Sequence, residues 1–125
     1  SLLLGFLISF ILIYLANQKF IHPILLAWSV AIFVYEFLSI NIIRLKNKQN
    51  PFKAGTDHLH HRLFEKNKSI FLTNFLISSF NIILFVVGYL SFLFINEIVS
   101  LILFVTFFMI FLILRNNTFK KSMEI

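Results

Sequence analysis

Three of the four histidines in this chain fall within residues 57–62, which read Asp-His-Leu-His-His-Arg. An imidazole can carry a proton, ligate a metal ion or bind a phosphate oxygen near neutral pH, so this segment is the first candidate for chemistry. If the segment is helical, His58 and His61 share a face at a spacing of three residues, and His60 points elsewhere. We therefore predict a ligand site at His58, His60 and His61, with two of the imidazoles on one helix face.

Two kinds of ligand suit this segment. A metal site would combine the imidazoles with Asp57, but the loop offers no convincing further ligand, so no metal site is predicted within this chain itself. An anion site would combine the imidazoles with Arg62, Lys53 and the free backbone N–H groups of a helix start capped by Thr56 or Asp57. A phosphate or diphosphate fits such a site. A segment with no specific ligand is the third reading, because basic charge also fixes topology and holds anionic lipid headgroups.

Glu36 is the second candidate, because it lies inside the apolar stretch of residues 33–38. A carboxylate within a membrane is costly and is a functional suspect by default. We expect Glu36 to pair with a base such as Arg44, or to orient the histidine segment from the membrane side. The alternative is a protonated or interfacial Glu36 with no role in the site.

The elements that position these residues follow from the composition. Of 125 residues, 59% are hydrophobic and 13% are charged, with a net charge of +6. Soluble domains have about 45–50% apolar and about 25% charged residues, so a water-soluble globule is excluded. The absence of cysteine excludes disulfides and thiolate chemistry. Since only three glycines and two prolines interrupt the chain and no alternating pattern occurs, we predict an all-α polytopic membrane protein.

Four apolar segments predict four transmembrane helices at about residues 2–16, 20–43, 70–94 and 98–114. A long basic loop (about 41–69) and a basic tail (115–125) hold seven and three of the eleven Lys and Arg residues, and the two short turns hold one between them. The loop and the C-terminus are therefore predicted to be cytoplasmic. His22 and Trp28 are expected to be interfacial anchors, and Gly88 is expected to allow close helix packing.

The histidine segment resembles a known enzyme family. Residues 50–63, which read Asn-Pro-Phe-Lys-Ala-Gly-Thr-Asp-His-Leu-His-His-Arg-Leu, are similar to the cytoplasmic His-x-His-His motif of bacterial polyprenyl-phosphate N-acetylhexosamine-1-phosphate transferases and the related phospho-N-acetylmuramoyl-pentapeptide transferase. Residues 42–45 also match the pattern before that motif. The opening residues 1–7 resemble the segment that follows the family's Gly-Asp-x-Gly-Ser motif, with Ser1 as its last residue. The chain is therefore expected to be the C-terminal part of a longer enzyme.

The resemblance implies a bacterial cytoplasmic-membrane enzyme that moves a sugar-1-phosphate from a UDP-sugar to a polyprenyl phosphate and releases UMP. It implies that His58, His60 and His61 position phosphate or act as a base, and that Arg62 binds substrate. Lys53 and Asp57 are weaker substrate-binding candidates, and Glu36 and Arg44 are supporting residues. Magnesium is the implied cofactor, but the family's catalytic aspartates lie upstream of Ser1, so the isolated chain is predicted to be inactive. No nucleic-acid partner is expected.

Two other classes stay open from the residues alone. Four short spans with one intramembrane carboxylate also describe a small proton-coupled exporter, in which Glu36 would be the coupling site. Such exporters have minimal loops, which the 29-residue basic stretch at 41–69 does not match. A non-catalytic membrane protein with a loop that binds anionic lipid is the other alternative.

Overall fold

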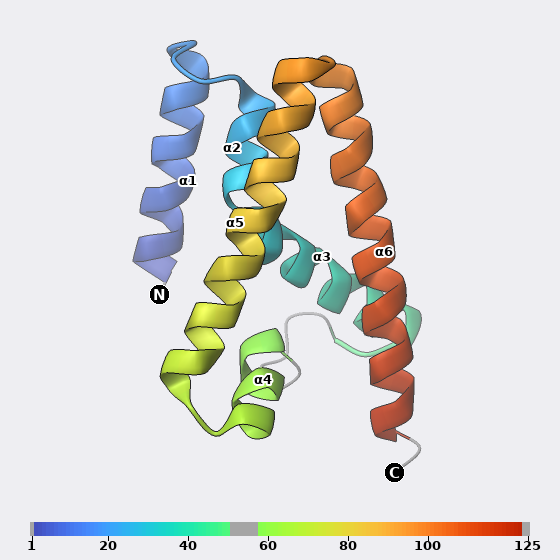
Figure 1. Ribbon diagram of the computed structural model, residues 1–125. Coiled ribbons are helices and arrows are strands. Elements are labelled where there is room, and N and C mark those ends of the chain that lie inside the picture. The colour runs from blue at the N-terminus through green and yellow to red at the C-terminus, as the bar shows by residue number, and fades with distance from the viewer. Residues whose placement is uncertain (1, 51–57, 124–125) are drawn as a thin grey trace.

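The computed structural model describes residues 2–50 and 58–123, and within these ranges the regular structure is entirely helical, as predicted. Its helices are α1 (Leu2–Asn17), α2 (Pro23–Ser29), α3 (Ala31–Lys46), α4 (Leu59–Asn67), α5 (Ile70–Phe94) and α6 (Glu97–Met123). In Figure 1, α5 and α6 form a long antiparallel pair, α2 and α3 pack against that pair, and α1 stands at the side. We name two ends of this bundle. The turn end holds Lys19 and Asn96, and the histidine end holds α4 and the last turns of α6.

Two helices are long and apolar enough to cross a membrane. These are α5 and the first 22 residues of α6, and only 11% and 6% of their most apolar stretches are buried inside the chain. Their exposed apolar side chains are compatible with contact with lipid. Helix α1 has 16 residues and is shorter than a span needs. The structure therefore supports two such helices, or three if α2 and α3 count as one bent span, where four were predicted.

The second predicted span, residues 20–43, is not one helix. It divides at Val30 into α2 and α3, whose axes differ by 75°. The Asn81 side chain of α5 fills the break: its Nδ2 donates to the Ser29 carbonyl (2.7 Å), and its Oδ1 accepts from the Ile32 N–H (3.1 Å). Backbone groups freed by a break in an apolar environment need such partners. The break was missed because the residues that satisfy it lie about fifty positions away in the sequence.

The core lies toward the turn end, where α2, α5 and α6 meet. Trp28 is fully buried, and its Nε1 donates to the Ser100 hydroxyl (3.0 Å), which itself donates to the Gly88 carbonyl (3.1 Å). A Cβ on Gly88 would lie 2.2 Å from the Trp28 ring, so only glycine permits this contact. The expected close approach at Gly88 is observed. The expected interfacial position of Trp28 is wrong, because the indole N–H finds its partner inside the bundle.

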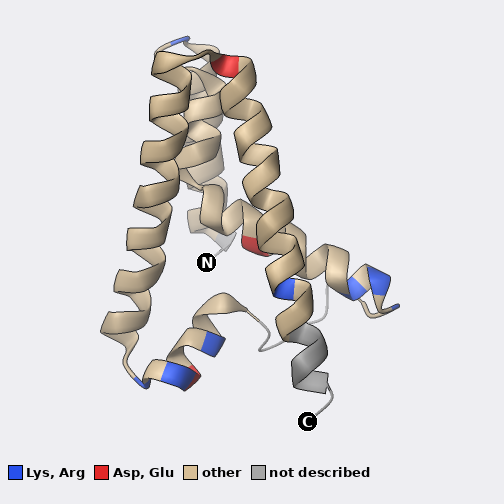
Figure 2. Ribbon diagram, turned by 45° about the vertical axis from the view of Figure 1, so that its right-hand side comes forward, with Lys and Arg blue, Asp and Glu red and all other residues tan. Residues whose placement is uncertain are grey.

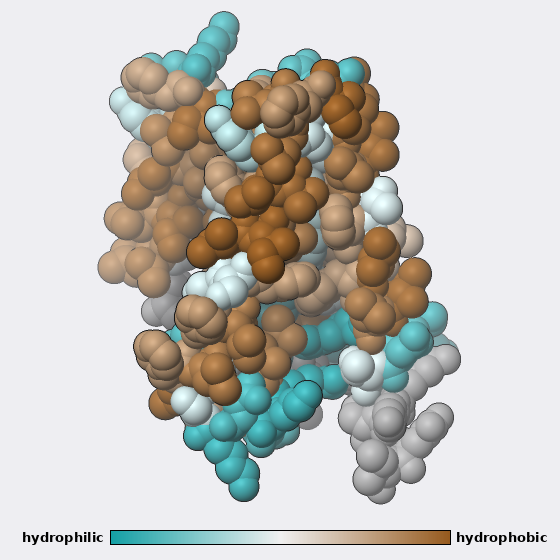
Figure 3. Space-filling view, in the orientation of Figure 1, coloured by the Kyte–Doolittle hydropathy of each residue, from teal (hydrophilic) through white to brown (hydrophobic). Residues whose placement is uncertain are grey.

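The predicted long loop at 41–69 is largely helical where it is described. Helix α3 continues to Lys46, α4 occupies Leu59–Asn67, and α5 begins at Ile70. Figure 2 shows that the described Lys and Arg residues gather at the histidine end, apart from one at the turn end. The space-filling view in Figure 3 shows hydrophilic surface around α4 and also at the turn end, with an apolar band over the long helices between them. The chemistry predicted from the sequence therefore belongs to one end of the bundle.

Candidate functional site

The histidine segment forms the start of α4. His58 is its N-cap with an extended backbone (φ −69°, ψ 148°), and the first intrahelical bonds run to the His58 carbonyl from the N–H groups of His61 (3.1 Å) and Arg62 (3.2 Å). The prediction that Thr56 or Asp57 caps this helix is therefore wrong. Lys53 and Asp57, both predicted to bind substrate, lie outside the described residues, so their predicted roles remain expectations.

The three imidazoles form one row. The ring centroids of His58 and His60 are 5.6 Å apart and nearly parallel, and those of His60 and His61 are 4.2 Å apart. The expectation that His60 points away from its neighbours is wrong, because His58 precedes the helix and its extended backbone does not follow helical spacing. All three rings can thus contact one ligand or two adjacent ones.

His60 has the most perturbed environment of this row. Desolvation lowers its pKa below the ordinary value of 6.5, the neighbouring His61 and His58 lower it further, and the Glu36 carboxylate opposes them. A neutral imidazole offers one N–H donor and one acceptor nitrogen. At neutral pH, His60 is therefore suited to hydrogen bonding or to accepting a proton.

Two cavities border the histidine row. One of about 530 Å³ lies between α3, α4 and α5, and its polar lining comes from Glu36, His58, His60, Asn74 and Ser78. A second, of about 300 Å³, is lined by His60 and His61 together with Phe64 and the start of α5. His60 borders both cavities, which places it centrally in the candidate site.

A third cavity, of about 480 Å³, joins the histidine end to the apolar band. It lies between α4, α5 and α6, and almost all of its lining is apolar. Its polar residues are Arg62, Arg115 and Thr118, and its apolar lining comes from Ile32, Leu59, Leu63, Leu76, Ile77, Phe80, Phe111 and Leu114. We call this cavity the arginine groove. Its combination of hydrocarbon surface and guanidinium groups suits an amphiphile with an anionic head.

Glu36 is joined to the histidine segment, but through partners that the sequence did not indicate. The Leu59 N–H donates to Glu36 Oε1, and the same oxygen lies 3.6 Å from His58 Nδ1 and 3.8 Å from Arg115 Nη2. Arg44, the base expected to pair with Glu36, is buried in the last turn of α3. Arg115 was predicted to lie in the basic tail at 115–125. In the structure it lies in α6, which continues directly from the apolar residues 98–114 to Met123.

Magnesium does not fit the part of the chain that the structure describes. In residues 2–50 and 58–123, no three His or acidic side chains are arranged to hold a metal ion. Magnesium needs carboxylates and waters in a near-ideal octahedron, and Glu36 is already engaged with an amide and a guanidinium. We therefore assign no step of the chemistry to a metal held by these residues.

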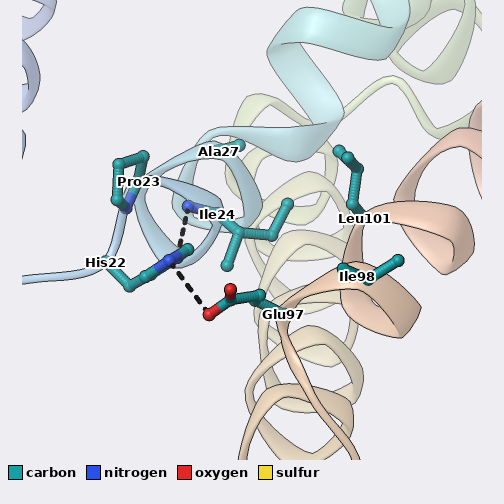
Figure 4. Close-up of a pocket in the computed structure, with 7 residues that line it drawn as sticks. All are labelled: His22, Pro23, Ile24, Ala27, Glu97, Ile98 and Leu101. Atoms are coloured by element: carbon teal, nitrogen blue, oxygen red, sulfur yellow. Dashed lines mark hydrogen bonds and ion pairs between the residues drawn. The ribbon is translucent and has the colours of Figure 1, made fainter.

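The turn end has its own pocket, of about 370 Å³ (Figure 4). There His22 Nδ1 accepts from the Ile24 N–H (3.4 Å) and His22 Nε2 lies 3.5 Å from Glu97 Oε2. His22 thus caps α2 and joins it to the start of α6. The remaining lining is apolar, from Pro23, Ile24, Ala27, Ile98 and Leu101, so this pocket lacks the clustered polar groups of the histidine end.

A scan against protein-family models, a search of curated proteins and a search of solved structures each found no match to this chain. The family resemblance of the histidine segment therefore rests on its residues alone. The candidate site is defined by its geometry: three adjacent imidazoles, two cavities beside them and the arginine groove.

Proposed function

We propose that this chain is the substrate-binding part of a bacterial membrane phosphoglycosyl transferase, which moves a sugar-1-phosphate from a UDP-sugar to a polyprenyl phosphate and releases UMP. The observation that carries the proposal is the position of the histidine row at the basic end of an apolar bundle, next to the arginine groove. Such a reaction joins a water-soluble donor to a lipidic acceptor, so its site belongs where cationic and apolar surfaces meet.

In the proposed reaction, a phosphate oxygen of the polyprenyl phosphate attacks the sugar-bearing phosphorus of the UDP-sugar. A new P–O bond forms there, and the bond to the UMP oxygen breaks. Phosphoryl transfer depends mainly on positioning and on neutralising charge along the phosphates. The guanidinium of Arg62 supplies positive charge, and the neutral imidazole of His60 offers a hydrogen bond or accepts a proton from the acceptor phosphate.

The arginine groove is the proposed binding site of the polyprenyl phosphate. Its apolar lining would cover isoprenoid carbons, and Arg62 would face the phosphate. The histidine row lies on the other face of α4, where the nucleotide sugar can enter from the water side. In this arrangement the lipid acceptor binds an apolar surface and the nucleotide sugar binds a polar one.

Binding tests the proposal directly. The 125-residue chain in nanodiscs is mixed with a short-chain polyprenyl phosphate, and binding is followed by calorimetry. We expect R62Q to weaken binding about tenfold, because it removes one charge-assisted contact. K66Q is the matched control, since Lys66 is an exposed basic residue on the same helix.

Three outcomes contradict the proposal. Equal binding of polyprenol and polyprenyl phosphate would show that the groove binds only the hydrocarbon chain and does not recognise the phosphate. Equal loss of affinity in R62Q and K66Q would show that binding depends on overall positive charge and not on Arg62. Equal binding of phosphatidylglycerol would favour a loop that holds anionic lipid in general. Release of UMP by the purified 125-residue chain would contradict the expectation that this chain lacks the catalytic acids.

The exporter alternative makes a different prediction at Glu36. There the carboxylate must exchange protons during transport, so E36Q would abolish proton-coupled drug efflux. In the structure Glu36 accepts the Leu59 N–H and lies beside the Arg115 guanidinium. These contacts favour a structural role for the carboxylate over a role in binding and releasing protons during transport.

A further inference from the structure

Glu36 lies at the meeting point of three helices. It belongs to α3, it accepts the Leu59 N–H of α4, and its Oε1 lies 3.8 Å from Arg115 Nη2 of α6. Its side chain is 14% exposed and that of Arg115 is 6% exposed, so the pair is largely shielded from solvent. A shielded carboxylate is costly unless it has hydrogen-bond or ion-pair partners, and here such partners come from two different helices.

The Leu59 N–H is the first amide of α4 and has no acceptor inside its own helix. His58 occupies the N-cap but makes no capping bond with its side chain. The acceptor is instead the Glu36 carboxylate, whose negative charge also interacts favourably with the helix start. The N-cap function of α4 is therefore supplied by another helix.

Helix α4 packs against α5, but none of its nine residues is fully buried. The bond to Glu36 ties its first residue to α3, and the three imidazoles lie at that beginning. A change at Glu36 should move the histidine row without unfolding the long helices.

We propose that Glu36 is a positioning residue that fixes the start of α4, and with it the His58–His61 segment, and that Arg115 holds the Glu36 carboxylate in place for this task. The proposal does not rest on the transferase function, because it concerns where the histidine row lies and not which ligand the row binds. It makes the last turns of α6 part of the site through an ion pair.

The absence of cysteine allows a direct test by spin labelling of the whole chain in nanodiscs. Nitroxides at K66C and N96C report the distance from α4 to the turn end, and labels at F71C and N96C report α5 alone. We expect E36A to raise the population of displaced α4 about tenfold, since a hydrogen bond to a charged group contributes about that factor. The α5 pair should keep its distance distribution. E97Q, which changes the acid at the turn end, is the matched control.

Further variants separate the two contacts. E36Q keeps an oxygen acceptor for the Leu59 N–H and removes the charge facing Arg115, so we expect a smaller displacement than in E36A. R115Q should displace α4 as well. The exchange E36R with R115E restores opposite charges but offers no acceptor to α4, and α4 should stay displaced.

A spectroscopic readout distinguishes positioning from general stability. The pKa of His60 is lowered by desolvation and by its histidine neighbours, and Glu36 opposes this. The imidazole resonances of His60 should therefore titrate at lower pH in E36Q than in the parent chain, and should not change in E97Q.

Each contrary result overturns a named part of the proposal. An unchanged α4 distribution in E36A, or equal broadening of the α5 pair, removes the positioning role. An unchanged distribution in R115Q removes the part assigned to Arg115. Recovery in the exchanged pair would show that the charges, and not the bond to Leu59, hold α4.

Discussion

The two ends of the bundle are built in opposite ways. At the turn end, Trp28 fills the space above Gly88 and completes its polar contacts with the Ser100 hydroxyl. At the histidine end, the polar groups gather around cavities of about 300 to 530 Å³, and α4 buries no residue completely. The turn end also has a pocket of about 370 Å³, but apart from His22 and Glu97 its lining is apolar. The difference therefore indicates that the turn end supplies stability through its packed core and that the histidine end offers more polar partners to a ligand.

This contrast has a physical basis. A dense core tolerates little change in volume, because each side chain already meets its neighbours at van der Waals distance. A cavity with unfilled space and charged lining contributes little to stability, but it offers partners to a ligand. Substitutions at the two ends should therefore separate stability from binding.

The largest effect is expected at Gly88. G88A places a Cβ 2.2 Å from the Trp28 ring, and neither the ring nor the helix backbone can move away easily. Overpacking of this kind costs about 3 kcal/mol, which thermal unfolding in detergent would detect. The matched control is G5A, because nothing lies within 4 Å of a Cβ at Gly5. Equal stability of G88A and the parent chain would contradict the description of a dense turn end.

Asn81 tests the junction between the two ends. N81L removes the partners of the Ser29 carbonyl and the Ile32 N–H at the break between α2 and α3. We expect a loss of about 2 kcal/mol in the free energy of unfolding, because two backbone groups lose their hydrogen bonds in an apolar environment. N117L is the control, since Asn117 is exposed near the end of α6. If N81L unfolds like N117L, the break is held by something other than the amide.

A change of pH should affect the histidine end. Because desolvation and the neighbouring histidines lower the pKa of His60 below 6.5, the folded state binds fewer protons there than the unfolded state. The contribution of His60 to the stability of α4 is therefore complete above about pH 6.5 and declines as the pH falls below that value. Histidine NMR would give the titration midpoint, and spin labels on α4 would follow its position.

Two results bear on this pH prediction. In H61Q the midpoint of His60 should rise, because a positive neighbour has been removed. A midpoint at or above 6.5 in the parent chain would contradict the described environment of His60.

The smallest effect is expected at Lys68, which ends α4 in the left-handed region (φ 51°). Glycine adopts this conformation without strain, which stabilises the folded state, but it also increases the conformational entropy of the unfolded chain. We expect the net effect of K68G to be a stabilisation of the end of α4 by about 0.5 kcal/mol. Hydrogen exchange of the α4 amides would measure the gain, with K66G as the control inside the helix. A faster exchange in K68G than in the parent chain would show that the Lys68 side chain contributes more than its backbone costs.

The sequence indicated part of the candidate site and of the fold. The clustering of His58, His60 and His61 is a property of the sequence, and the structure adds that their rings lie side by side. Helix α5 matches the apolar segment at 70–94, because a long apolar stretch without proline forms a helix wherever it lies, and the single glycine in it, Gly88, does not break the helix. The roles of these residues in phosphate chemistry stay a prediction.

By itself the sequence determined an all-helical, apolar chain with its basic residues and imidazoles gathered in a few segments, because helix formation and hydropathy depend on residues close together in the chain. Only the tertiary structure decided the break at Val30, the burial of Trp28 and the meeting of Glu36 with Arg115. Each of these depends on a partner some fifty to eighty residues away, such as Asn81, Ser100 or Arg115. Local spacing carries no information about such partners, since packing of the helices alone brings them together.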